Sequence, residues 1–182
     1  MRCKFMKPLL FLTTILFLTV SIFAQSPGVD PLDLSITMPK ACYAPDETVR
    51  VQVQIANNSD NILSLFRPKK EEQLRGLHLV FIDERGKIAG NRDPIHMVHP
   101  RNLTGDEFVQ IQPRDALVEG MNFSPRLSGL RLGRVYFVYV SYESTLFEND
   151  VPATVRKDPV WTFEKPKIYS NKVEFEVRKN CH

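Results

Sequence analysis

The sequence predicts an all-β protein with two packed sheets. Apolar and polar residues alternate with a period of two along most of the chain, most regularly over residues 49–55. Turns rich in Pro, Gly and Asn separate the alternating segments, and no apolar stripe repeats at helical spacing. A half-buried antiparallel strand needs one apolar and one polar face, and many short strands between turn signals are typical of a β-sandwich of about eight strands.

The first expected strands follow from local pattern. Residues 32–38 and 49–55 each alternate apolar with polar side chains, so each buries one face. The run Asn-Asn-Ser-Asp-Asn at 57–61 is a cluster of turn-forming residues, which ends the second strand and leads into a third at 62–66.

The later strands begin at 77–83, and the tight turn 84–87 closes a hairpin after it, with Gly86 supplying a positive φ. The remaining strands are expected at 107–112, 116–123, 134–143 and 173–177. Because residues 134–143 carry apolar side chains on both faces, we expect this strand at the centre of a sheet.

The first two dozen residues have the layout of a secretory signal peptide. A positively charged start precedes an uncharged, mostly apolar stretch at 8–23, and Ala24 offers a small residue for cleavage. The alternative is a membrane anchor, which needs about twenty apolar residues, whereas this run is shorter and interrupted by hydroxyl groups. We expect residues 1–24 to be removed, leaving one secreted or periplasmic domain, 25–182, without a membrane attachment.

Charge and motifs exclude several classes of function. The chain has 24 Lys and Arg against 21 Asp and Glu, and the expected signal peptide accounts for the three-residue excess with Arg2, Lys4 and Lys7. The mature domain is therefore formally neutral, which gives no electrostatic case for a nucleic-acid partner. There is no phosphate-binding glycine loop and no Gly-x-Ser-x-Gly nucleophile motif, so no cofactor and no catalytic residue are predicted.

Two cysteines, Cys42 and Cys181, remain after the expected cleavage. In an oxidising compartment a single pair of this kind indicates a disulfide, the alternative being two unpaired buried thiols. Closing a loop of this length is worth about 4–5 kcal/mol in the chain-entropy model.

Motifs in the first half of the domain resemble bacterial immunoglobulin-like domains. The strand at 49–55 followed by Asn-Asn-Ser-Asp at 57–60 is similar to the start of such domains. The turn Ile-Gln-Pro-Arg-Asp at 111–115 resembles their I-x-P-G-E/D turn, except that Arg114 stands where Gly is usual.

The second half carries three further motifs of that family. Leu-Gly-Arg-Val-Tyr-Phe-Val-Tyr-Val at 132–140 resembles its aromatic penultimate strand, and Val-Trp at 160–161 with Ser-Asn at 170–171 resembles its closing motif. The resemblance implies a small secreted immunoglobulin-like sandwich, with a weaker similarity to the intracellular proteinase inhibitor-like family. It also implies structural roles for Tyr136, whose phenol would bond the preceding turn, and for Trp161.

The same resemblance gives a topology for the disulfide. In an immunoglobulin-type sandwich the first strand can run parallel to the last at one sheet edge. Cys42 follows the strand expected at 32–38, and Cys181 follows the strand at 173–177. Parallel strands would bring both cysteines to one end of the domain, within bridging reach.

The only candidates for a metal site are His96 and His99, in a long loop that also holds Asp93 and Asp106. Two imidazoles and a carboxylate are suitable ligands for a divalent metal. Histidines of loops are more often simply solvated, so the expectation is that no metal binds.

Three loops, 66–76, 87–106 and 144–159, are longer than a sandwich requires. They mix apolar and Arg side chains, such as Phe147 and Arg156, which suits a protein partner, although variable surface loops would look the same. The sequence therefore favours an exported, non-catalytic binding module, with proteinase inhibition as a sharper version that the family resemblance implies. The alternative is a metal-dependent or hydrolytic enzyme using His96, His99 and loop carboxylates.

Overall fold

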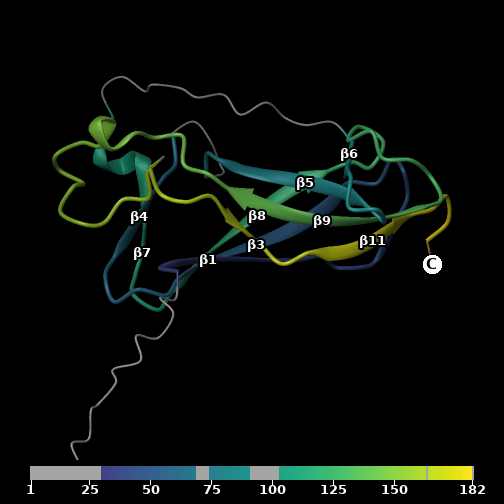
Figure 1. Ribbon diagram of the computed structural model, residues 1–182, viewed down its shortest axis with the longest axis horizontal. Helices are drawn as coiled ribbons and strands as arrows, with labels where there is room; N and C mark the ends of the chain where they lie inside the picture. Colours follow the sequence, from purple (N-terminus) through teal and green to yellow (C-terminus); the bar gives the residue numbers. More distant parts are fainter. Residues whose placement is uncertain (1–29, 69–73, 91–102, 163, 182) are drawn as a thin grey trace, which may run out of the picture.

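The computed structural model describes residues 30–68, 74–90, 103–162 and 164–181, which form a β-sandwich that extends beyond its sheets at one end (Figure 1). One sheet has three antiparallel strands in the order β1–β3–β8. Their bounds are Leu32–Thr37 for β1, Val49–Asn57 for β3 and Ala116–Phe123 for β8. The all-β sandwich predicted from the alternating pattern, with the immunoglobulin-like class that the family resemblance implied, is confirmed.

The second sheet has the order β2–β11–β9–β5–β6. Its strands are β2 (Cys42–Tyr43), β5 (Leu77–Asp83), β6 (Ile88–Ala89), β9 (Arg134–Tyr142) and β11 (Val173–Val177), and the short β10 (Ile168–Tyr169) pairs with the end of β9. Strand β9 lies between β11 and β5, which is the central place that its two apolar faces predict.

A separate two-stranded ribbon pairs β4 (Leu63–Phe66) with β7 (Phe108–Ile111). Two short 3-10 helices accompany it, η1 (Gly105–Glu107) and η2 (Glu148–Asp150). In the described parts of the chain there is no helix with the length and apolarity needed to cross a membrane.

All eight expected strands are present within a residue or two of their expected bounds, and three more occur in the described residues. The additional strands are β2, β6 and β10, each of two residues. A two-residue strand cannot show alternation, so the pattern that identified the longer strands carries no signal for these.

The core lies between the two sheets. The inward side chains of β3, Val49 to Ile55 at every second position, are completely buried. From the facing sheet, the Phe175 ring lies 5.7 Å from that of Phe123 and 5.9 Å from that of Tyr136, measured between centroids. The edge-on contact of Phe175 with Phe123 joins the two sheets, whereas Tyr136 packs on Phe175 from the neighbouring strand of the same sheet. Apolar burial and aromatic packing thus hold the sandwich together.

The expected pairing of the first strand with the last is wrong. Strand β1 runs antiparallel to β3 in the three-stranded sheet, and the parallel neighbour of β11 is instead β2, where Cys42 lies opposite Glu176. The chain passes from one sheet to the other between β1 and β2. Pro39, which has no backbone N–H to donate to a ladder, lies in this crossing.

The switch of sheets still brings the two cysteines together. Cys42 and Cys181 are joined as a disulfide with their Cα atoms 5.6 Å apart. Backbone bonds from Glu176 N–H to the Ala41 carbonyl (2.8 Å) and from Arg178 N–H to the Tyr43 carbonyl (3.1 Å) flank the bridge. The disulfide therefore holds the short edge strand β2 against the last strand.

Replacing both cysteines by alanine is expected to lower the free energy of unfolding by about 2–4 kcal/mol, because the long loop between them is no longer closed in the unfolded chain. The β-sheet circular dichroism signal should persist, since the buried faces of the sheets are unchanged. Urea unfolding of oxidised protein measures the effect, with chemically reduced wild type as the matched control. An unfolding midpoint equal to that of the oxidised wild type would contradict this role.

Candidate functional site

The part of the molecule beyond the sheets is a packed unit, which we call the platform. It consists of β4, β7, η1 and residues 144–162, at the left of Figure 1. It has its own apolar cluster, formed by buried Phe66, Leu146, Val151 and Val155, with half-buried Leu103, Phe108 and Val160 packed against them. The long segment expected as a loop at 144–159 therefore folds around a small core of its own.

Backbone bonds attach this segment to the ribbon. The Ser64 N–H donates to the Pro159 carbonyl (2.9 Å), and the Trp161 N–H donates to the Ser64 carbonyl (3.0 Å). Residues 159–161 thus lie beside β4 as a short parallel neighbour. The Trp161 side chain is buried in the main core, so this residue joins the platform to the sandwich.

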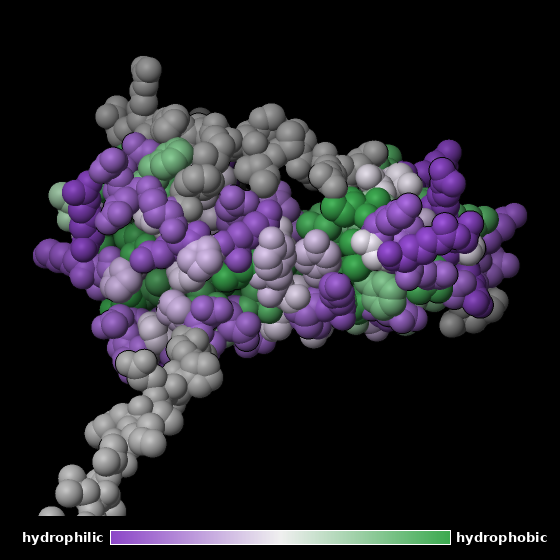
Figure 2. Space-filling view, in the orientation of Figure 1, coloured by the Kyte–Doolittle hydropathy of each residue, from purple (hydrophilic) through white to green (hydrophobic). Residues whose placement is uncertain are grey.

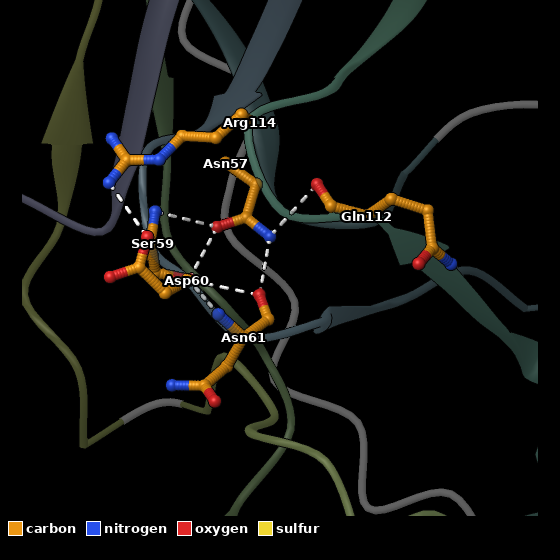
Figure 3. A network of polar contacts seen from close by, with 6 residues as sticks. All are labelled: Asn57, Ser59, Asp60, Asn61, Gln112 and Arg114. Carbon is orange, nitrogen blue, oxygen red and sulfur yellow. Dashed lines mark hydrogen bonds and ion pairs between the residues drawn. The ribbon is translucent and has the colours of Figure 1, made fainter.

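The side chain of Asn57 connects the end of β3 to the turn that precedes β4 and to the end of β7 (Figure 3). Its amide nitrogen donates to the carbonyls of Asn61 (2.8 Å) and Ile111 (2.9 Å), and lies 3.2 Å from that of Gln112. Its oxygen accepts bonds from the backbone N–H (3.0 Å) and hydroxyl (2.7 Å) of Ser59. Asn57 is completely buried, so these bonds replace every contact with water that the amide has lost.

Arg114, which stands where the related turns have Gly, has a φ of +63°. This left-handed conformation is one that L residues avoid and glycine adopts freely. The Arg114 N–H donates to the Asn57 carbonyl (3.0 Å), and its guanidinium lies 2.8 Å from Asp60 (Figure 3). Because both side chains of this ion pair are exposed, it offsets little of the backbone strain.

A partly buried ion pair links the platform to β8. Glu119 is only 6% exposed, and its carboxylate bonds the Arg67 guanidinium at the end of β4. The Arg67 N–H also donates to the Glu107 carbonyl in η1 (2.7 Å). Since an unpaired buried carboxylate is costly, this contact fixes Arg67, and with it the end of the ribbon, on the three-stranded sheet.

The platform and the two residues Glu164 and Lys165 surround an open pocket of about 560 Å³, which we call the platform pocket. Its charged lining is made of three acidic and three basic residues, Glu148, Asp158, Glu164, Arg156, Lys157 and Lys165. The Arg156 side chain is held by the Val151 carbonyl, to which its Nε donates at 2.9 Å.

The carboxylate of Glu164 is fixed at the rim of this pocket. It accepts a bond from the Glu148 N–H at 3.3 Å. Hydrogen bonds from its own backbone N–H and from the Thr162 side chain lower the pKa of Glu164, so it is ionised at neutral pH. The pocket therefore offers fixed charges of both signs.

Tyr136 and Tyr142, both on β9, contribute their phenol groups to the fold. The Tyr136 oxygen accepts a bond from the Arg131 N–H (2.8 Å), which is the contact with the preceding turn that the family resemblance implies. Tyr142 is completely buried beside Ser144 where β9 enters the platform, and burial raises the pKa of its phenol well above the usual value.

The described structure does not test the residues proposed for metal chemistry. His96 and His99 lie outside the described residues, as does Asp93, so the metal hypothesis stays a prediction. Within residues 30–68, 74–90, 103–162 and 164–181, no three His, Cys, Asp or Glu side chains are placed to hold a metal ion.

The three loops expected to bind a partner lie in different places. The described residues of 66–76 begin in the platform at the end of β4, and 144–159 forms most of it. The described ends of 87–106 are far apart, because 103–106 leads into η1 whereas 87–90 lies with β6 at the opposite end of the sandwich (Figure 1). Of the three loops, 144–159 and the described start of 66–76 therefore lie in the platform, whereas 87–106 is divided between the two ends of the domain.

Sequence reasoning missed the platform pocket and the Arg67–Glu119 pair. A signal for the pair existed, because Glu119 occupies an inward position between Leu117 and Met121 in the alternation of β8. A charged residue on an apolar face indicates a buried partner. The pocket has no such signal, since its residues look like ordinary surface charges in the sequence.

Comparisons with known proteins add little. No protein-family model matches the chain, and no curated protein matches it. Among solved structures, sporulation control protein Spo0M from Bacillus subtilis is similar with a TM-score of 0.44 and 11% identity, covering 82% of this chain and 50% of that one. The CARDB domain of PF1109 from Pyrococcus furiosus gives a TM-score of 0.39 and 11% identity, covering 82% and 96%. The chain spans half the length of Spo0M, and function must be argued from the site.

Replacing Arg114 by glycine is expected to leave the free energy of unfolding unchanged or raise it by up to about 1 kcal/mol, because glycine relieves the positive φ. Arg114→Val should lower it by about 1 kcal/mol or more, since a β-branched residue fits this conformation worst. Asp60→Ala serves as a control for the exposed ion pair and should change stability by less than about 1 kcal/mol. Equal urea midpoints for the glycine and valine variants would refute the argument from strain.

Proposed function

We propose that the mature domain is a non-catalytic binding module of the periplasm or cell exterior that holds a protein partner on the platform. The observation that carries this proposal is the platform pocket, an open cavity with fixed charges of both signs on a unit that has its own core. The signal-like segment 1–24 and the Cys42–Cys181 pair support the location.

The chemistry of the pocket favours a polar peptide segment as the bound group. Lys157, Lys165 and Glu148 are exposed at its lining, so a partner with charges of both signs finds complementary groups there. Such complementarity mainly selects the right partner and speeds encounter. Pro159 and half-buried Val160 add apolar surface beside the charges, which is the usual mixture of a protein-binding surface.

The packed interior of the platform supports binding over a merely variable loop. Phe66 and Leu146 are buried within it, and the Ser64 and Trp161 backbone bonds fix its return to the ribbon. A surface that is ordered before binding loses less conformational entropy when the partner arrives. The long segment 144–159 is therefore suited to hold its charges in place for a partner.

Proteinase inhibition is the sharper form of the same proposal. Its support is the resemblance of residues 57–60 and 132–140 to the proteinase inhibitor-like family, and these residues have structural roles here. Titrating a serine and a cysteine proteinase with the mature protein tests it. Stoichiometric inhibition would identify a proteinase as the partner. Unchanged proteolysis would exclude proteinase inhibition but not the binding of another protein on the platform.

A photo-crosslinking amino acid at Lys157 is expected to capture one protein of defined mass from the envelope and culture fractions of the source cells. The same group placed at Lys172, which is exposed between β10 and β11, is the matched control and should capture none. With the captured partner purified, Lys157→Glu should weaken binding by about ten-fold, about 1.4 kcal/mol, because it reverses one charge of the pocket. Lys172→Glu should leave the affinity unchanged.

Two results would overturn the proposal. One is equal capture from positions 157 and 172, which would mean that the platform is not the binding surface. The other is stoichiometric zinc in the purified mature protein that is lost on His96→Ala. That result would support the alternative, a metal-dependent or hydrolytic enzyme using His96, His99 and loop carboxylates.

A further inference from the structure

A second pocket lies at the end of the sandwich opposite the platform. It opens between the β5–β6 hairpin and the loop that joins β8 to β9, has a volume of about 450 Å³, and we call it the hairpin pocket. The strand register places it at the first end of β9, where Arg134 lies opposite Val177 and Tyr136 opposite Asp83. The other end of β9, at Tyr142, leads into the platform. Its volume is within the range of small-ligand sites.

The walls of the hairpin pocket are fixed by the backbone. Gly90, with a φ of +77°, lies so close to the β8–β9 loop that a Cβ atom there would be 2.3 Å from the Ser128 carbonyl oxygen. The loop is closed by bonds from Ser128 N–H to the Ser124 carbonyl (2.9 Å) and from Leu130 N–H to the Pro125 carbonyl (2.8 Å). The cavity is therefore built by the close approach of hairpin and loop.

Three arginines line this pocket, Arg85, Arg131 and Arg134, and all three side chains are exposed. None of the three guanidinium groups has a hydrogen bond or ion pair within the described part of the chain. Two carboxylates also line it. That of Asp83 accepts bonds from the backbone N–H groups of Arg85 and Lys87, both at 2.9 Å, and Glu84 is the remaining one.

Two other cations near this end have ion-pair partners. Arg126 is paired with Asp46 at 3.2 Å, and Lys40 with Glu47 at 2.7 Å. In the hairpin pocket the three arginines outnumber the two carboxylates, so the lining carries a net positive charge. Guanidinium groups bind carboxylate and phosphate oxygens in bidentate geometry, so this arrangement suits an anionic group.

Apolar surface accompanies the arginines. Ile88 is 45% exposed at the pocket, and half-buried Ala89 and Val135 also line it. Figure 2 shows apolar atoms set among strongly hydrophilic ones at this right-hand end of the molecule. A ligand that uses both kinds of surface has an anionic head and an apolar portion.

We propose that the hairpin pocket binds an amphiphilic anion, with the phosphate or carboxylate head held by Arg85, Arg131 and Arg134 and the apolar part lying on Ile88 and Ala89. The site is separate from the platform and does not depend on the function proposed there. Its ligand is either a soluble molecule or the headgroup of an anionic lipid, which share this chemistry.

The test measures binding of octyl phosphate, below its micelle concentration, to the oxidised mature protein by calorimetry. Saturable one-to-one binding is expected, and Arg131→Gln/Arg134→Gln should weaken it about ten-fold or more, because two charge-assisted contacts are lost. Arg126→Gln, an exposed arginine near the pocket but outside its lining, is the matched control and should bind as wild type. Unchanged unfolding midpoints show that all variants fold.

Two further probes divide the sources. The first is co-sedimentation with vesicles of phosphatidylcholine and phosphatidylglycerol. If the wild-type protein sediments with the vesicles and the Arg131→Gln/Arg134→Gln variant does not, the ligand is a lipid headgroup. If octyl phosphate binds but the vesicles do not, the ligand is a soluble molecule. Inorganic phosphate should bind at least about ten-fold more weakly than octyl phosphate, because it lacks the apolar part. The proposal is overturned if neither octyl phosphate nor vesicles bind, if Arg126→Gln loses as much affinity as the double variant, or if inorganic phosphate binds equally well.

Discussion

The buried amide of Asn57 fixes the place at which the platform leaves the sandwich. Strand β3 ends at this residue, and the ribbon strands β4 and β7 begin and end within reach of its side chain. Five hydrogen bonds connect the amide to the turn that precedes β4 and to the end of β7, in a completely buried position. Because a buried amide is costly unless it is hydrogen-bonded, this side chain ties the turn before β4 and the end of β7 to the end of β3.

The two ends of the domain depend on different interactions. The platform rests on the Asn57 network and on the partly buried Arg67–Glu119 contact, whereas the opposite end is held by the Cys42–Cys181 bridge and the aromatic packing around Phe175. The rigid sheets between them separate the two pockets. A partner on the platform and an amphiphilic anion in the hairpin pocket could therefore be bound at the same time without competing for residues.

Local pattern predicted the fold well. Strands β1, β3 and β11 carry their own alternation, β9 has the two apolar faces of a central strand, and each main turn has its own Asn, Gly or Pro. It failed where structure depends on distant parts of the chain. After the chain changes sheets between β1 and β2, Cys42 lies in a parallel pairing with β11. This pairing could not be predicted, because a strand of two residues has no alternating pattern. The charges at Lys157 and Glu164 look like ordinary surface residues until the fold places them around one pocket, whereas Glu119 on an apolar face was a readable signal.

Hydrogen exchange of the Asn57→Asp variant, followed by mass spectrometry, tests most directly whether the Asn57 amide positions the platform. The substitution removes the donor and places a carboxylate against backbone carbonyls, so exchange should accelerate in 63–66, 108–111 and 144–162. Strands β9 and β11 should keep their protection, and Asn122→Asp, on the exposed face of β8, should change neither region. Uniform acceleration across both sheets, or an unchanged platform, would contradict the account.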